Sequence, residues 1–178
     1  FKTLPGAEAD VTYGYDLLGR LTTPSNTGTT ITRGYDALSR LTSDAQPFGT
    51  LSYQYDAAGR RTRLTWWDSF YVTYDYQVTG EVTTIKENGS TALVTFGYDD
   101  LGRRKSLTRA NGTSTNYNFD AVSRLSSLGA DLAGTVNDLT LGFGYNAGSQ
   151  IISTTRSNNA YSWTGAANVN RGYTANGL

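Results

Sequence analysis

The sequence of 178 residues contains no cysteine, no histidine and no methionine, and only three prolines. Without cysteine there is no disulfide framework, and cysteine usage says nothing about the redox compartment. Without histidine or cysteine, the chain has no serine–histidine triad, no cysteine nucleophile and no histidine metal site. We therefore expect a protein that is not an enzyme and that holds no cofactor and no metal.

Neither sign of charge is in excess, because Lys plus Arg and Asp plus Glu both number 15. A nucleic-acid-binding protein would need a basic face, so we expect no nucleic-acid partner. No apolar run approaches the roughly 18 residues of a membrane span, which argues against membrane insertion, and no signal peptide is visible. Because methionine is absent, we expect Phe1 not to be a natural start and the chain to be an internal piece of a longer protein.

The sequence does contain a phrase of eight residues that returns along the whole chain. It is first YDLLGRLT from Tyr15, then YDALSRLT from Tyr35 and YDAAGRRT from Tyr55. Weaker copies begin at Tyr76, Tyr98, Phe119 and Tyr145. The leading aromatic residues are about 20 residues apart, and a fixed period of this size indicates a repeat architecture. We expect residues 1–178 to form a single repeat array, regular over 11–126 and looser over 140–178.

Each phrase predicts one β-hairpin. Thr12-Tyr13-Gly14-Tyr15 alternates in the manner of a strand, which puts Tyr13 and Tyr15 on one face. Asp16 then opens a turn and caps its amides with the carboxylate, and Gly19 supplies the positive φ that follows a type I turn in a bulged hairpin. The chain returns as a second strand through Arg20-Leu21-Thr22.

A second kind of turn falls about midway between successive phrases. It reads Asn26-Thr27-Gly28, Gln46-Pro47-Phe48-Gly49, Asn88-Gly89 and Asn111-Gly112. Asn-Gly between alternating segments is a strong hairpin signal, because both residues tolerate positive φ. Two turns per period predict an all-β fold, an antiparallel meander of roughly 14 to 16 strands with two strands per repeat. Because open twisted sheets seldom exceed about 10 strands, we expect this one to coil into a spiral wall, shell or solenoid.

Three stretches depart from the rhythm. The segment 63–76 is rich in aromatic residues and has a predicted turn near Asp68-Ser69. Trp66 and Trp67, read as adjacent strand residues, would point to opposite faces, which makes them candidates for a contact surface. Residues 127–139 predict a longer connection with a short helical turn or a surface loop. After Tyr145 the phrases loosen, with degenerate units at 161–165 and 173–178.

The positions that define the repeat carry an aromatic residue, an aspartate, a small residue and an arginine. We interpret the aspartates and arginines as capped turns with adjacent ion pairs, and the tyrosines as cross-strand packing stacked from repeat to repeat. Glycan binding along such a ladder is the functional alternative. The copies at Gln77/Glu81 and Asn146/Gln150 lack the charged pair, and Ser39, Ser123 and Ser149 replace the turn glycine. The predicted motif residues are Tyr15, Asp16, Gly19, Arg20, Tyr35, Asp36, Arg40, Tyr55, Asp56, Gly59, Arg60, Tyr98, Asp99, Gly102, Arg103, Phe119, Asp120 and Arg124.

The phrase Tyr-Asp-x-x-Gly-Arg-Leu-Thr resembles the YD-repeat, or Rhs-repeat, family over essentially the whole chain. The resemblance implies a long β-sheet that spirals into a hollow shell. In bacteria such shells commonly enclose a variable C-terminal toxin, and related shells occur in insecticidal toxin complexes and in teneurins. Toxin-bearing members end in a core region with a Pro- and Asp-containing self-cleavage motif, and this sequence contains nothing like it.

These observations lead to a first hypothesis and two alternatives. The first is a non-enzymatic wall segment of a large secreted protein, extracellular or at the cell surface, whose partners are the rest of its own chain and an enclosed toxin or other cargo. The alternative is an extracellular filament or surface adhesin in which identical copies add strand to strand. A third hypothesis is a carbohydrate-binding module that uses Trp66 or Trp67.

Overall fold

The computed structural model describes residues 10–161 and the backbone of 169–170. Apart from one short 3₁₀ helix, the regular structure of these residues is all β-strand. The chain divides into two compact units, and each is taken by itself below. Unit 1 is Phe1–Asp75 with Ile85–Thr91, and unit 2 is Tyr76–Thr84 with Ala92–Leu178.

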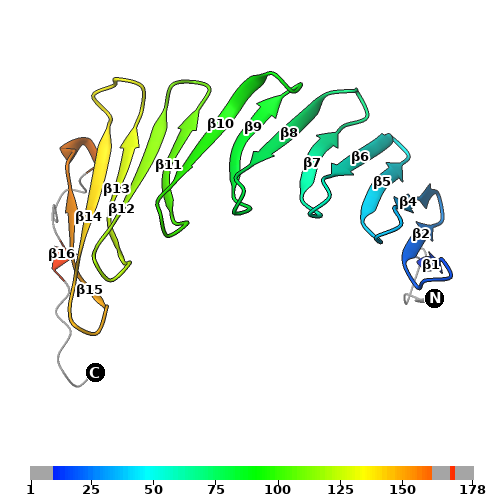
Figure 1. The fold of residues 1–178 in the computed structure, drawn as a ribbon, viewed down its shortest axis with the longest axis horizontal. Helices are drawn as coiled ribbons and strands as arrows, with labels where there is room; N and C mark the ends of the chain where they lie inside the picture. The colour runs from blue at the N-terminus through cyan, green and yellow to red at the C-terminus, as the bar shows by residue number, and fades with distance from the viewer. Residues whose placement is uncertain (1–9, 162–168, 171–178) are drawn as a thin grey trace. The chain divides into compact units, whose positions relative to one another are not determined.

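In unit 1 the strands follow one another in chain order and pair with antiparallel neighbours (Figure 1). A three-stranded sheet comes first, in the order β1-β2-β3. A second sheet begins at β4 and continues through β8, followed by the Ile85–Glu87 half of β9. The strands are β1 (Thr12–Tyr15), β2 (Leu21–Asn26), β3 (Thr29–Thr30), β4 (Thr32–Tyr35), β5 (Leu41–Gln46), β6 (Gly49–Tyr55), β7 (Arg61–Thr65), β8 (Tyr71–Tyr76) and β9 (Val82–Glu87).

Unit 2 is built in the same way. It starts with the Val82–Thr84 half of β9, and the strands from β10 to β16 follow in chain order, antiparallel throughout the pairs that are resolved. Its other elements are β10 (Thr91–Tyr98), β11 (Arg104–Arg109), β12 (Ser114–Phe119), β13 (Leu125–Asp131), β14 (Leu139–Tyr145), β15 (Ile151–Arg156), the 3₁₀ helix η1 (Asn159–Tyr161) and β16 (Val169–Asn170). The predicted antiparallel meander with two strands per repeat is therefore confirmed.

The turns of the phrases are bulged hairpins, as the sequence predicts. In the first, Gly19 has φ 75° and its amide donates to the Asp16 carbonyl at 3.0 Å, while Asp16 donates to the Arg20 carbonyl at 3.0 Å. The extra residue shifts the pairing register of β1 and β2 between Gly14 and Tyr15. The same shift occurs before Tyr35, Tyr55, Tyr98, Phe119 and Tyr145.

The turns between phrases lie at the predicted places, but they are not all of one type. At Asn88-Gly89 both residues have positive φ, 45° and 76°, as expected for a two-residue hairpin loop. At Asn111-Gly112 only Gly112 does, with φ 81°, and the Arg109 amide donates to the Thr113 carbonyl. That Asn-Gly pair therefore closes the same bulged turn as the phrases, and the explanation through positive φ at both residues is wrong there.

The connection predicted at 127–139 begins later in the structure than the sequence indicates. Strand β13 runs on to Asp131, so the connection is residues 132–138. Its ends are held together where the Leu132 amide donates to Asp138 Oδ1 at 2.9 Å. It contains no helical turn, and the 3₁₀ helix lies instead at Asn159–Tyr161. Of the predicted degenerate units at 161–165 and 173–178, only Tyr161 falls within the described residues.

The described residues contain almost no core. Val72 is the one buried apolar side chain among them, at 7% exposure, and Asp44 the one buried polar side chain, at 8%. Asp44 is neutralised by Arg33, whose Nε lies 3.3 Å from Asp44 Oδ2. Globular domains bury side chains between two or more layers, whereas here each strand pairs only with its neighbours in the sheet. Both units are thus built as walls rather than as filled cores.

Candidate functional site: the contacts between repeats and the pocket at Glu81

The aspartate of each phrase holds its own turn and its own arginine. Asp16 Oδ1 accepts hydrogen bonds from the amides of Leu18 and Arg20, each at 2.9 Å. Asp16 Oδ2 accepts one from Arg20 Nε at 2.6 Å. Both carboxylate oxygens are therefore used within five residues, which fixes the arginine in one direction. The same carboxylate–guanidinium bond, at 2.6–2.7 Å, joins Asp36 to Arg40, Asp56 to Arg60, Asp99 to Arg103 and Asp120 to Arg124.

These contacts lower the pKa of every aspartate in the five pairs. For Asp16, Asp36 and Asp120 the largest cause is the hydrogen bond from the arginine's backbone amide, with the guanidinium bond acting in the same direction. For Asp56 the Arg60 side chain comes first. For Asp99 partial burial is the largest influence and raises the pKa, but the two Arg103 bonds outweigh it. All five carboxylates are therefore held in the charged form.

The arginine of one phrase also reaches the next phrase. Arg20 Nη1 donates to the carbonyl of Asp36 at 3.1 Å, and its Cζ lies 4.8 Å from the centre of the Tyr35 ring. The Tyr35 hydroxyl donates in return to the carbonyl of Leu21 at 2.8 Å. We call this set, an arginine with the aromatic ring and turn carbonyl of the following phrase, the inter-repeat contact. It joins neighbouring repeats by side chains as well as by strand pairing.

The inter-repeat contact recurs in both units. Arg40 Nη1 donates to the Asp56 carbonyl at 2.9 Å with Cζ 4.8 Å from the Tyr55 ring, and the Tyr55 hydroxyl donates to the Leu41 carbonyl at 2.8 Å. In unit 2, Arg124 makes the equivalent bond to the Asn146 carbonyl at 3.1 Å and lies 4.6 Å from the Tyr145 ring. At Phe119 the ring stands over Arg103 at 4.4 Å, but phenylalanine has no hydroxyl to complete the set.

The serines that replace the turn glycine keep the backbone of the turn. Ser39, Ser123 and Ser149 have φ between 61° and 67°, in the left-handed region. Ser39 Oγ accepts a bond from Arg20 Nη1 at 3.2 Å, and Ser149 Oγ accepts one from Arg124 Nη1 at 3.3 Å. A serine can thus compensate the strain of this conformation by an additional contact with the previous repeat.

The copy at Asn146 replaces the ion pair with neutral groups. Asn146 Oδ1 accepts from the Gln150 amide at 3.0 Å, and Asn146 Nδ2 donates to Gln150 Oε1 at 2.7 Å. This copy lacks the charged pair, as the sequence predicts, yet the turn is held by equivalent bonds. The predicted stacking of tyrosine on tyrosine, by contrast, is wrong for Tyr35, Tyr55 and Tyr145. Their rings lie against guanidinium groups, because an arginine of the preceding phrase occupies the space between repeats.

The prediction that Trp66 and Trp67 are adjacent residues of a strand is wrong. They lie in the turn between β7 and β8, where the Trp66 amide donates to the Phe70 carbonyl at 2.8 Å and Ser69 has φ 70°. Trp66 packs on Phe70, with ring centres 5.3 Å apart. Trp67 is 54% exposed and meets the exposed Phe48 edge to face, at 5.3 Å and 83°. Trp67 therefore does face outward, but from the tip of a turn.

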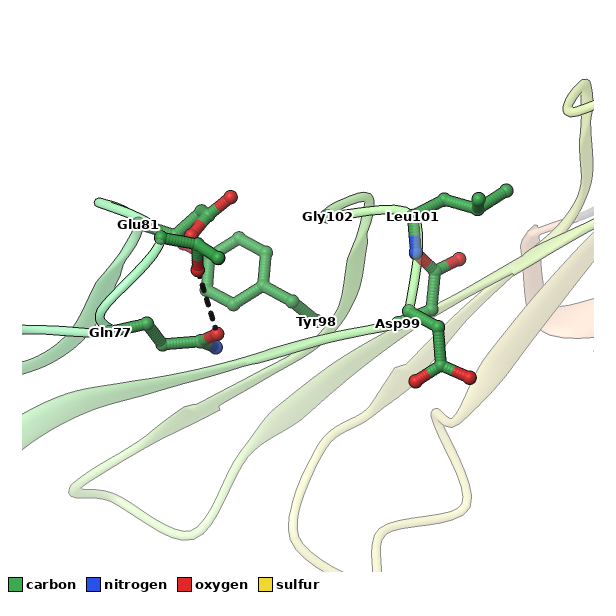
Figure 2. A pocket seen from close by; sticks show the side chains of 8 residues that line it. Gln77, Glu81, Tyr98, Asp99, Leu101 and Gly102 are labelled. Atoms are coloured by element: carbon green, nitrogen blue, oxygen red, sulfur yellow. Dashed lines mark hydrogen bonds between the residues drawn. The ribbon is translucent and has the colours of Figure 1, made fainter.

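In one phrase the position that arginine takes elsewhere carries a negative charge instead. Glu81 takes the arginine position of the phrase that begins at Tyr76, and beside it lies a pocket of about 440 Å³. Its lining includes Gln77, Glu81, Tyr98, Asp99 and Gly102. Figure 2 shows the Tyr98 ring directed back toward Gln77 and Glu81, with Asp99 and Leu101 on its other side. The replacement of arginine by Glu81 can be seen in the sequence, but the pocket beside it cannot.

Neither a metal centre nor a membrane span is indicated by the described residues. No group of three or more metal-ligating side chains gathers in residues 10–161. Within the same range, no helix is long and apolar enough to cross a membrane.

Comparison with known proteins agrees with the repeat pattern. The family model for the RHS repeat matches residues 35–65, which span the second and third phrases. No curated protein matches the sequence. Among solved structures, the chain is similar to the crystal structure of TcdB2-TccC3-Cdc42, with 18% identity and a TM-score of 0.71. TcdB2-TccC3 itself, and TcdB2-TccC3 without its hypervariable C-terminal region, match with 18% identity and TM-scores of 0.70.

The matched region is a small part of those proteins. It covers 84–85% of this chain but only 9% of theirs. At 18% identity the likeness concerns the fold, whereas the RHS-repeat match rests on the sequence of the phrases themselves. The resemblance drawn from the phrase Tyr-Asp-x-x-Gly-Arg-Leu-Thr is thereby confirmed: residues 35–65 carry the RHS repeat, and the chain has the fold found in TcdB2-TccC3.

Proposed function

We propose that this chain is a stretch of the β-sheet wall of a large secreted YD-repeat protein and that the wall encloses a toxin or other cargo. The observation that carries the proposal is the near absence of a core. A sheet in which Val72 is the one buried apolar side chain among residues 10–161 has two faces to present, as a wall between an interior and solvent requires. In this proposal the wall separates the enclosed cargo from solvent, and its function is not enzymatic.

The side chains at the tips of the phrase turns support the proposal that this chain is part of a larger protein. At least one of the two residues after the aspartate position is an exposed large apolar side chain in five of the phrases. In unit 1 these are Leu17, Leu18 and Leu38, and in unit 2 they are Val78, Leu101 and Val122, with exposures from 66% to 105%. Within each unit, exposed apolar groups repeated at the tips of the turns mark a contact surface. Further turns of a spiralling sheet would cover such a surface.

The comparisons support the same proposal from another side. The fold of this chain is also found in a 9% portion of the TcdB2-TccC3 chains, which supports its being one piece of a much longer protein. One of those structures is described as lacking a hypervariable C-terminal region. A variable segment beyond a repeated sheet is what an enclosed cargo would be in the longer protein to which we assign this chain. Secretion to the cell surface or the extracellular space belongs to the same proposal.

Limited proteolysis of the native particle that contains this chain tests the proposal. An enclosed cargo resists protease while the wall is folded and is degraded once a denaturant opens the wall. A double variant, Tyr35→Phe with Tyr55→Phe, should lower the denaturant concentration at which the cargo becomes accessible. Cargo digested at the same rate before and after opening of the wall would contradict enclosure.

The two alternatives predict different results for the same particle. A filament or adhesin built by strand addition between copies would show protection that rises with protein concentration and depends on no enclosed segment. A carbohydrate module would need a flat aromatic platform. Trp67 and Phe48 meet at 83°, so the two rings do not form one plane, and this pair gives sugar stacking little support.

A further inference from the structure

The phrase at Tyr76 keeps the backbone of the repeat but loses its arginine. The Gln77 amide donates to the Glu81 carbonyl at 2.8 Å and the Gly80 amide to the Gln77 carbonyl at 3.0 Å, as in the other phrase turns. The following aromatic residue is also in its usual place, since the Tyr98 hydroxyl donates to the Val82 carbonyl at 2.9 Å. The frame of an inter-repeat contact is therefore present, but none of the residues that the structure describes places a guanidinium in it.

The other repeats define what this frame binds. At the equivalent places, a guanidinium lies 4.6–4.8 Å from the rings of Tyr35, Tyr55 and Tyr145. It donates at the same time to the carbonyl of the residue after each ring. In the phrase at Tyr98 the corresponding groups are the Tyr98 ring and the Asp99 carbonyl. Both belong to residues that line the pocket of about 440 Å³.

Glu81 adds a negative charge to this frame. Its Oε2 is buried and accepts no hydrogen bond from any residue that the structure describes. The hydroxyl of Thr79 and the backbone amide of Glu81 keep the pKa of Glu81 below its ordinary value, against the effect of burial, so the carboxylate is charged at neutral pH. Asp100 also lines the pocket, whereas Asp99 is neutralised by Arg103 at 2.7 Å. A buried carboxylate oxygen without a partner is costly unless a donor reaches it.

A guanidinium satisfies all these groups better than other cations do. It is planar, stacks on an aromatic ring and donates in two directions within its plane, whereas an ammonium is a point charge that prefers water. A divalent metal is not favoured, because no cluster of three or more ligating side chains is found among residues 10–161.

We propose that the pocket at Glu81 binds the guanidinium group of an arginine side chain that does not belong to the phrases described above. The incoming group lies on the Tyr98 ring, donates to the Asp99 carbonyl and pairs with Glu81. The arginine belongs either to another segment of the longer protein, its cargo included, or to a separate partner. The inference stands independently of the wall function, because it rests on the contacts of one pocket.

Titration with N-acetyl-arginine amide tests this proposal. Tyrosine ring carbons are labelled, and the Tyr98 signal, assigned by its loss in Tyr98→Phe, is followed by NMR. We expect saturable shifts with a dissociation constant on the order of 1 mM. The neutral isostere N-acetyl-citrulline amide should leave the signal in place. Equal shifts by citrulline and arginine, or no saturable shift by arginine, would overturn the proposal.

Two variants make the assignment to Glu81 specific. Glu81→Gln keeps the size of the side chain and should weaken arginine binding about tenfold. Glu81→Arg places the chain's own guanidinium in the frame and should abolish saturable binding. Binding by Glu81→Arg as tight as that of the parent chain would contradict the site. If Glu81→Arg does not fold, Glu81→Gln alone decides, and unchanged affinity in that variant sinks the proposal.

The same titration on the complete native particle separates the two sources of the arginine. If the Tyr98 signal responds in this chain but not in the particle, a segment of the longer protein already fills the pocket. If it responds in both, the pocket is open to a separate partner. The titration reads a local signal at Tyr98, whereas the proteolysis experiment reads protection of a cargo. The pocket can therefore bind arginine in a protein that encloses no cargo, and a protein that encloses a cargo can lack arginine binding at this pocket.

Discussion

The Tyr35 hydroxyl donates a hydrogen bond to the carbonyl of Leu21, 14 residues earlier, at 2.8 Å. The same tyrosine ring lies against Arg20, which in turn donates to the carbonyl of Asp36. Two bonds in opposite directions thus join one repeat to the next at the same place. Contacts of this kind connect nearest neighbours only, as expected for a protein whose stability is a sum over repeats and the surfaces between them.

Removal of one hydroxyl measures the strength of such a connection. Tyr55→Phe deletes the bond to the Leu41 carbonyl at 2.8 Å but keeps the ring over Arg40. It should lower the free energy of unfolding in urea by about 1 kcal/mol. Tyr13→Phe is the matched control, because Tyr13 is 42% exposed and its hydroxyl makes no hydrogen bond to another of the described residues. Equal effects of the two variants would contradict a role for the bond between repeats.

The converse change should stabilise the protein. Phe119 lies over Arg103 at 4.4 Å in the place that tyrosine takes elsewhere. In Tyr98 and Tyr145 the hydroxyl reaches the carbonyl of the residue after the arginine position, at 2.9 and 2.7 Å. Phe119→Tyr should therefore donate to the Arg104 carbonyl and raise the unfolding free energy by about 0.5–1 kcal/mol. A destabilised variant would mean that this frame differs from the others.

The serines at the turn position allow the cost of the left-handed backbone conformation to be compared with the gain from the hydrogen bond to arginine. Ser123 has φ 67° and Ser39 has φ 61°, but of these two described serines only Ser39 accepts a hydrogen bond from an arginine, Arg20, at 3.2 Å. Ser123→Gly should raise the unfolding free energy by about 0.5 kcal/mol, because glycine adopts this conformation without steric cost. Ser39→Gly should gain less, since it also removes the acceptor for Arg20. Thermal unfolding of both variants compares them, and an equal gain in both would show that the bond contributes nothing.

Acid should weaken the repeats in a defined window. The pKa values of Asp16, Asp36, Asp56, Asp99 and Asp120 are lower in the folded chain than the ordinary value. Between the two values the unfolded chain binds more protons, so stability is complete above about pH 4 and falls as the pH drops through the folded pKa values.

Urea unfolding from pH 7 down to pH 2.5 measures this dependence. The midpoint should stay level to about pH 4 and then decline. A combined variant, Asp16→Asn with Asp36→Asn, keeps Oδ1 as the acceptor of the turn amides, as Asn146 does, but loses the oxygen that pairs with arginine and the titration. It should be less stable at pH 7, and its decline on acidification should be shallower. A midpoint that rises on acidification would contradict the direction of the pKa shifts.

The sequence predicts the hairpins well because their causes are local. Asp16 and Gly19 determine the turn between them, and Asn88-Gly89 determines the intervening one, so both could be located from a few consecutive residues. The turn near Asp68-Ser69 could also be located, but the positions of Trp66 and Trp67 within it could not. Their turn contains neither the aspartate in first place nor a glycine, and Ser69 takes the positive φ instead.

The contacts between repeats could not be predicted, since they join residues 14 to 22 positions apart. Whether a tyrosine stacks on another tyrosine or on an arginine depends on which side chain the carboxylate of the previous turn orients into the gap. Arg20 is so oriented by Asp16. The pocket at Glu81 depends on the same relation, because it arises where the side chain that would fill the gap is absent.

Electron microscopy of the native particle that contains this chain tests whether the sheet encloses a cargo. We expect a closed hollow shell with density inside it and with sheet strands spaced about 4.8 Å apart in its wall. A continuous fibre with an axial repeat set by one copy, and no enclosed density, would contradict enclosure of a cargo.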